Sequence, residues 1–181
     1  EKEKLEILTH YGLRDQQYIL YVGALQPRKN LVRLIEAFGI LKHTAPEAIL
    51  VLAGERAWLS DPILAARESS PYRDDILLTG QVPFAHLPAL YQGARCFAFP
   101  SLYEGFGIPL LEAFASGTPV LTANNSSLPE VAGDAALYAS AFDTGEITEQ
   151  LLRLWGDEIL RNTLVQKGKE RLRAFSWDTC A

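Results

Sequence analysis

Two glutamates, Glu104 and Glu112, stand in a stretch that is otherwise apolar and rich in glycine. Pro109 suits the first turn of a helix and Gly117 suits a helix end, so a helix is predicted to begin near Ile108. The first carboxylate would then precede the helix, and the second would lie about one turn inside it. Two carboxylates beside free helix amides could bind the hydroxyls and the phosphate of one ligand.

Glycine residues shape the backbone between the two carboxylates. Gly105 and Gly107 bracket Phe106, and such a pair lets the backbone approach a ligand closely. This arrangement favours a polyhydroxylated ligand that carries phosphate. The simpler alternatives are that Glu104 only assists the helix N-terminus and that Glu112 lies on an exposed helix face.

A second polar turn, GALQPRKN, occupies residues 23–30 and places Arg28 beside Lys29 at the start of a helix. A forked guanidinium and a compact ammonium there suit a diphosphate, whose charge the helix N-terminus also favours. The alternative is a solvated basic turn. The turn matches neither GxGxxG nor the Walker loop, so the common dinucleotide and P-loop interpretations lack their sequence signatures.

Two further loops carry weaker signals. The backbone of Val82 could pair with a nucleotide base, although an ordinary strand–helix connection is the simpler interpretation. The loop TANNSSLPE (122–130) leads into another helix, and Ser127 with Glu130 has the spacing of a capping box. The amides of this loop could also close over a phosphate or sugar. His86 is interpreted as a surface or capping residue rather than a catalyst.

Short apolar runs alternate with helical patterns along almost the whole chain. The runs lack polar alternation, which is typical of parallel strands buried on both faces. Strands are predicted at 18–23, 48–54, 75–80, 94–100, 118–123 and 135–140, and helices at 29–43, 83–93, 108–117, 144–155 and 157–174. This alternation predicts one doubly wound α/β domain with a parallel sheet. Ligands bind at the carboxyl ends of such strands, where the polar loops begin.

Composition excludes several classes of protein. The 181 residues carry a formal net charge of −5, which argues against a nucleic-acid surface. No apolar run approaches the ~20 residues of a membrane-spanning helix, and the charged opening is unlike a signal peptide. Cys96 and Cys180 form no CxxC pair, so neither a zinc site nor a disulfide is indicated, and a cytoplasmic setting is expected. Because the chain contains no methionine, we expect it to begin inside a longer protein.

From about residue 15 to its end, the chain resembles the retaining glycosyltransferases of family 4, also called glycosyl transferases group 1. The resemblance is carried by YILYVGALQPRKNL and by EGFGIPLLE followed by A-x-A-x-G-x-P-V. It implies the C-terminal half of a GT-B enzyme, in which two Rossmann-like domains face each other. Residues 1–14 would be a remnant of the interdomain connection and 15–181 the nucleotide-sugar-binding domain. The acceptor-binding N-terminal domain would be absent, and FSWDTCA would begin a terminal helix that crosses to the other half.

The resemblance also implies roles for individual residues. Arg28 and Lys29 would neutralise the donor's diphosphate, with Arg28 replacing an arginine that many members carry where this chain has Ala24. Glu104 would contact hydroxyls of the transferred sugar, and Glu112 would bind the ribose. The expected catalytic residues are thus Arg28, Lys29 and Glu104, and the expected donor-binding residues are Gly23, Val82 (through its backbone, to the base), Gly105, Phe106, Gly107, Ile108 and Glu112.

The implied reaction moves a hexose from a nucleoside diphosphate sugar to an acceptor hydroxyl, with retention of configuration and without a metal or other cofactor. The turn GALQPRKN is similar to the form found in mannosyltransferases that build O-antigen and other polysaccharides. This favours GDP-mannose as donor, with UDP-glucose and other UDP-sugars as alternatives.

The resemblance places the acceptor, a glycan or lipid-linked molecule, on the absent half, so the chain alone is expected to be inactive. The full-length enzyme could associate peripherally with the inner face of a membrane. Two other classes remain as alternatives. One is a different GT-B enzyme, such as a sucrose or starch synthase. The other is a response-regulator-type module, which the basic turn after the first strand disfavours.

Overall fold

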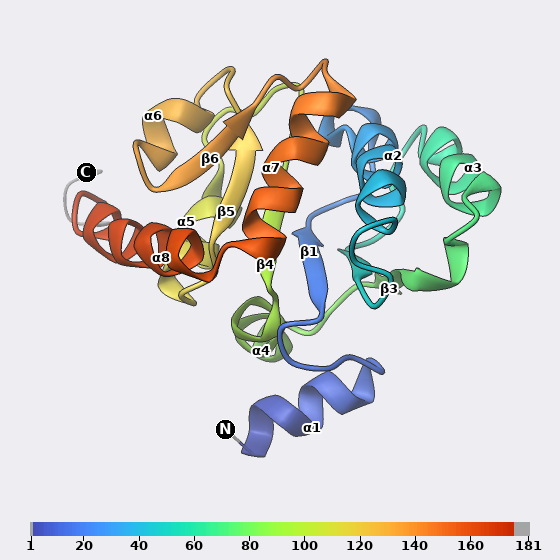
Figure 1. Ribbon diagram of the computed structural model, residues 1–181, viewed down its shortest axis with the longest axis horizontal. Coiled ribbons are helices and arrows are strands. Elements are labelled where there is room, and N and C mark those ends of the chain that lie inside the picture. Colours follow the sequence, from blue (N-terminus) through green and yellow to red (C-terminus); the bar gives the residue numbers. More distant parts are fainter. Residues whose placement is uncertain (1, 176–181) are drawn as a thin grey trace.

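The computed structural model describes residues 2–175 and shows a parallel six-stranded sheet covered by helices on both faces (Figure 1). The strands are β1 (Tyr18–Val22), β2 (Ile49–Ala53), β3 (Ile76–Gly80), β4 (Cys96–Phe99), β5 (Val120–Ala123) and β6 (Ala136–Ala139). Their order across the sheet is β3-β2-β1-β4-β5-β6. Every neighbouring pair is parallel. The predicted doubly wound α/β fold, Rossmann-like in its strand order, is therefore confirmed.

Strand order creates one special point in the middle of the sheet. After β1 the chain adds β2 and β3 on one side, and it then returns to place β4 on the other side of β1. The helices that follow β1 and β4, α2 (Leu31–Leu41) and α5 (Ile108–Ala115), therefore lie on opposite faces of the sheet, while the loops that lead to them start side by side. Open α/β sheets bind ligands at the carboxyl ends of the strands at this point of reversal.

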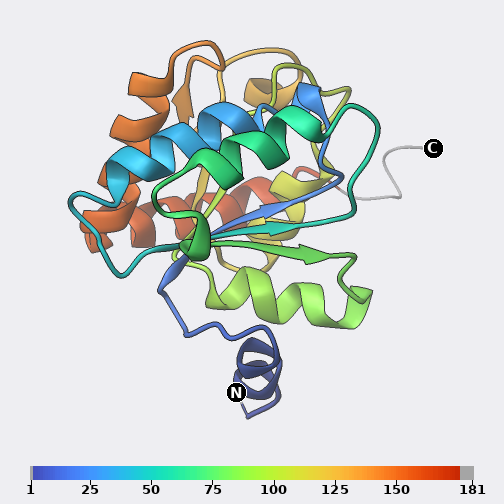
Figure 2. The same cartoon turned by 90° about the vertical axis from the view of Figure 1, so that its right-hand side faces the viewer.

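The helices form two layers. They are α1 (Lys2–His10), α2 (Leu31–Leu41), α3 (Asp61–Ser69), α4 (Leu87–Gly93), α5 (Ile108–Ala115), α6 (Leu128–Ala132), α7 (Thr144–Gly156) and α8 (Glu158–Leu172), with 3-10 turns η1 (Pro27–Lys29), η2 (Arg73–Asp75) and η3 (Phe84–His86). Helix α2 packs between α3 and α7, whereas α5 packs on α4 and α8. Figure 2 shows α2 and α3 on one face of the strands and α4 on the other.

The core lies between these layers and explains why the elements form. Four of the five side chains of β1, and all those of β4 and β5, are buried. Helix α2 buries residues at helical spacing, namely Leu31, Leu34, Ile35, Phe38 and Leu41. Each such side chain contributes roughly 1.5–3 kcal/mol when it is fully removed from water.

The structure differs from the sequence-based expectations in two places, and a third expectation lies outside the described residues. Helix α3 was not predicted, because Ile63 is the one residue that it buries and its apolar pattern is weak. The first helix after β1 begins at Leu31 rather than at residue 29, because Asn30 adopts a left-handed conformation (φ 62°) that interrupts the helical path. The predicted crossing segment FSWDTCA lies, apart from Phe175, outside the described residues.

Candidate functional site

The site lies where the turns that follow β1 and β4 meet. The backbone N–H of Leu102 donates to the carbonyl of Arg28 over 2.8 Å, which joins the β4 loop to η1. Parallel pairing of Leu20 with Phe97 brings the two strands side by side, so their carboxyl ends open at the same edge. The two sequence segments that were singled out independently are therefore one site.

Three predicted residues form a compact ion cluster at this edge. Lys29 Nζ contacts Glu104 Oε1 at 2.6 Å, and Arg28 Nη1 contacts Glu104 Oε2 at 2.7 Å. Lys29 is 7% exposed and Glu104 is 8% exposed, whereas the Arg28 side chain remains open to solvent. The sequence interpretation gave Glu104 and the two cations separate ligand groups, but it did not foresee that they contact one another.

The charges of this cluster follow from burial and pairing. Burial lowers the pKa of Lys29, and the hydrogen bond and charge of Glu104 oppose that effect without cancelling it. Burial raises the pKa of Glu104, but the hydrogen bonds from Lys29 and Arg28 outweigh burial and hold the pKa below its ordinary value. Two cations and one carboxylate leave one net positive charge facing the loop.

Asn30 holds the loops of three strands together, a role that sequence reasoning missed. Its side-chain amide donates to the carbonyl of Pro100 over 2.9 Å and to that of Ala141 over 2.7 Å. Its Oδ1 accepts from Arg33. Because these carbonyls follow β4 and β6, the residue next to Lys29 is fixed against both loops.

The loop after β5 supports the backbone that carries Glu104. The Ser127 hydroxyl donates to the carbonyls of Glu104 and Phe106, and the Ser126 hydroxyl accepts from the backbone N–H of Glu104. The capping box predicted for Ser127 and Glu130 is therefore wrong, since Ser127 makes no cap hydrogen bond to α6. The hydroxyl binds carbonyls from a distant part of the chain instead.

Unused backbone donors adjoin the ion cluster at the start of α5. The amides of residues 105–108 donate no hydrogen bond to any residue in the described part of the chain. Gly107 requires glycine, because its φ is +104° and an added Cβ would lie 3.0 Å from Leu128. At Gly105 an added Cβ would meet open space, so the packing of the described protein does not require glycine there. Phe106 and Ile108 are exposed.

Glu112 lies on α5, half-buried, rather than on a fully exposed helix face. Its Oε2 accepts a hydrogen bond from the Tyr91 hydroxyl over 2.9 Å. Tyr91 comes from α4, so α4 and α5 together position this carboxylate. No sequence signal connected the two residues, because they belong to separate helical patterns.

Two of the other predicted donor residues occupy different parts of the edge. Gly23 has a φ of +145°, and its carbonyl oxygen lies 2.0 Å from the place that a Cβ on Gly54 would take. Gly54, which was predicted only to end a strand, is thus required for the close approach of the β1 and β2 loops. Val82 is half-buried after β3, at the end of the sheet beyond β2.

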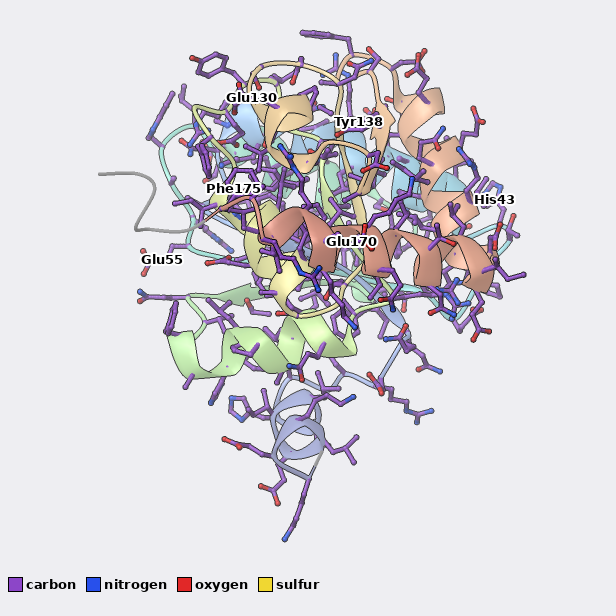
Figure 3. All side chains as sticks on the ribbon, turned by 90° about the vertical axis from the view of Figure 1, so that its left-hand side faces the viewer. His43, Glu55, Glu130, Tyr138, Glu170 and Phe175 are labelled. Atoms are coloured by element: carbon purple, nitrogen blue, oxygen red, sulfur yellow. The ribbon has the colours of Figure 1, made fainter. Side chains whose placement is uncertain are left out.

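Among the described residues, no histidine forms a hydrogen bond or ion pair with Arg28, Lys29 or Glu104. His86 Nδ1 and the Tyr11 hydroxyl are 3.0 Å apart, which links η3 to the segment after α1. His43 follows α2, and Figure 3 shows it on the opposite side of the molecule from Glu55, which follows β2. Within residues 2–175, no group of three or more His, Cys, Asp or Glu is placed to hold a metal ion. No helix in that range is long and apolar enough to span a membrane.

Solved structures support the architecture. The chain superimposes on sucrose-phosphate synthase from Thermosynechococcus elongatus with a TM-score of 0.83 and 26% identity, over 97% of this chain and 45% of that one. It also superimposes on the C-terminal domain of a glycosyl transferase group 1 family protein from Francisella tularensis, with a TM-score of 0.82 and 20% identity. That alignment covers 96% of this chain and 93% of the other, and at this identity it shows the fold alone.

Sequence relatives identify the family. The chain is 40% identical over 179 residues to O-antigen chain mannosyltransferase B of Escherichia coli, covering 98% of this chain and 47% of the relative. The chain thus spans about half the length of this curated relative. Residues 6–171 match the family described as glycosyl transferases group 1. This protein therefore belongs to the glycosyl transferases group 1 family.

Proposed function

We propose that this chain is the donor-binding part of a retaining mannosyltransferase that uses GDP-mannose. The observation that carries the proposal is the Arg28–Lys29–Glu104 cluster beside the unbonded amides of residues 105–108. A net positive charge next to free N–H groups suits a diphosphate, and a carboxylate in the same cluster suits sugar hydroxyls.

The proposed chemistry breaks the bond between the sugar's anomeric carbon and the diphosphate oxygen. The acceptor oxygen forms the new bond on the face from which the diphosphate departs, as retention requires, and the nucleoside diphosphate leaves with the bonding electrons and takes up the acceptor's proton. Negative charge therefore grows on the diphosphate, and preorganised donors at that point lower the barrier most effectively. Arg28, Lys29 and the N-terminus of α5 would supply these donors, so the chain's own residues would bind the leaving group without a metal cofactor.

Glu104 has a positioning part in this proposal rather than a nucleophilic one. Both of its oxygens already accept hydrogen bonds from cations, and this pairing makes the carboxylate a weak nucleophile. Each oxygen still has a lone pair free for a sugar hydroxyl. Glu112 would bind the ribose, and the backbone of Val82 would meet the base.

The preference for a mannosyl donor rests on sequence relatives. O-antigen chain mannosyltransferase B and the serotype-specific mannosyltransferase WbdA, which is 31% identical over 174 residues, are both named for mannosyl transfer. By the same inference, the acceptor would be a glycan or lipid-linked molecule bound by an N-terminal domain outside this chain. The complete enzyme would act in polysaccharide synthesis, in the cytoplasm or at the inner face of the membrane.

Calorimetric titration of the chain with GDP, GDP-mannose, UDP and UDP-glucose tests the proposal. We expect measurable binding of GDP and GDP-mannose, weaker binding of the uridine compounds, and no mannosyl transfer by the chain alone. Tighter binding of UDP-glucose would move the donor assignment to a UDP-sugar. Silence with all four nucleotides would refute the donor-site assignment itself.

A further inference from the structure

Tyr91 is a buried phenol whose hydrogen-bond partner belongs to the proposed donor site. It is 1% exposed, and its hydroxyl donates to Glu112 Oε2 over 2.9 Å. The ring packs on Phe97 with 5.3 Å between centroids, and the Tyr91 carbonyl accepts from the Thr118 hydroxyl over 2.7 Å. Ring and backbone are thus both held, so the hydroxyl has a defined position.

Other buried tyrosines of the described chain satisfy their hydroxyls differently. Tyr18 donates to the carbonyl of Leu90, and Tyr21 donates to the carbonyl of Ala24. A backbone carbonyl is therefore a sufficient partner for a buried phenol in this fold. Tyr91 instead donates to a half-buried carboxylate on a neighbouring helix. The need to satisfy a buried hydroxyl does not by itself explain this choice of partner.

The direction of this hydrogen bond is fixed. Burial first, and then the charge and hydrogen bond of Glu112, raise the pKa of Tyr91 far above its ordinary value. The phenol therefore remains a donor at any pH at which the protein would work. The other oxygen, Oε1 of Glu112, has no hydrogen-bond partner among the described residues and remains available to a ligand.

We propose that Tyr91 is a positioning residue that holds one oxygen of Glu112 and presents the other to the ribose hydroxyls of the donor. The inference rests on the proposed ribose-binding role of Glu112. Without the phenol, the glutamate side chain would have to be ordered by the nucleotide itself, and that cost would weaken binding. The effect should appear only with ligands that carry the ribose hydroxyls.

The test compares GDP with 2′,3′-dideoxy-GDP by calorimetry on the unaltered chain, Tyr91→Phe, Glu112→Ala and the double variant. The measured quantity is the dissociation constant of 2′,3′-dideoxy-GDP divided by that of GDP. Both constants are measured on one protein preparation, so a partly unfolded fraction affects them equally and cancels in the ratio. We expect Tyr91→Phe to lower this ratio by roughly 3- to 10-fold, which is less than the full effect of losing a hydrogen bond to a charged group, because the phenol acts on the ligand only through Glu112. In the Glu112→Ala background, the same change should do nothing.

Tyr18→Phe is the matched control. It removes another buried tyrosine hydroxyl that bonds to α4, but this hydroxyl bonds to a backbone carbonyl. It should lower thermal stability about as much as Tyr91→Phe while leaving the ratio unchanged. Tyr91→Leu is a second variant, which removes the same hydroxyl with a different change in packing. It should lower the ratio as Tyr91→Phe does.

The outcomes separate this inference from the proposed function. If Glu112→Ala lowers the ratio but both Tyr91 variants keep the ratio of the unaltered chain, the positioning role of Tyr91 is wrong and the ribose role of Glu112 stands. If Glu112→Ala itself leaves the ratio unchanged, or if the unaltered chain binds neither nucleotide, both assignments are overturned.

Discussion

Glu104→Gln would test the electrostatics of the ion cluster directly. The substitution keeps the size of the side chain and one carbonyl oxygen, but it removes the negative charge between Lys29 and Arg28. Lys29, which is almost fully buried, would lose the charge that compensates its ammonium. Breaking a buried pair from one side leaves an uncompensated charge, which is strongly destabilising.

The expected cost is below that of a fully buried pair. Removing one partner of a buried pair typically costs about 3–5 kcal/mol. Here the Arg28 side chain reaches solvent, and the amide oxygen of the introduced glutamine would still accept one hydrogen bond. We therefore expect a loss of about 2–3 kcal/mol in the free energy of unfolding. For a chain of this size, that corresponds to a melting temperature lower by roughly 4–12 °C.

Urea unfolding at pH 7, followed by circular dichroism, measures this loss. Glu68→Gln is the matched control, because Glu68 pairs with Arg67 and its side chain is 61% exposed. An exposed pair contributes about 0–1 kcal/mol, so the control should change stability little. If Glu104→Gln unfolds at the same urea concentration as the control, the cluster does not stabilise the fold and our reasoning about it fails.

Although Glu104→Gln should lower stability, it should strengthen anion binding. Removing the carboxylate raises the formal charge of the cluster from +1 to +2, so inorganic pyrophosphate should bind Glu104→Gln more tightly than the unaltered chain. This gain in pyrophosphate affinity should shrink as salt is added, because the Arg28 side chain reaches solvent and dissolved ions screen its charge. Weaker pyrophosphate binding by the variant would show that Glu104 is not the neutralising partner of the two cations.

Two further predictions concern acid stability and the strand loops. Because the folded-state pKa of Glu104 is lowered, its stabilisation is present above the unfolded value of about 4.3 and is lost as pH falls through the folded value. The stability gap between the unaltered chain and Glu104→Gln should therefore close below about pH 4 in urea titrations. Gly54→Ala should cost more than about 3 kcal/mol or prevent folding, since its Cβ would lie 2.0 Å from the Gly23 carbonyl oxygen. Gly105→Ala, which meets open space, should unfold within about 1 kcal/mol of the parent, and equal stability of both glycine variants would contradict this interpretation.

Local sequence determined the elements and the kinds of residue at the site. The apolar runs that became β1 to β6 lack polar alternation, and burial on both faces of a parallel sheet requires that pattern. Pro109 and Gly117 bounded the helix that became α5. Charged and glycine residues after β1 and β4 indicated a ligand edge, because the carboxyl ends of parallel strands share one side of a sheet.

Tertiary structure alone decided which of these residues meet. Lys29 and Glu104 are 75 positions apart, and they pair because β4 lies next to β1 rather than next to β3. Strand order also explains why Asn30 reaches the carbonyl of Ala141, 111 positions away. Such contacts leave no periodic pattern in the sequence, since periodicity reports only which face of an element is buried. The residue types in the loops therefore predicted a diphosphate and sugar site, while the crossover from β3 to β4 brought those residues together.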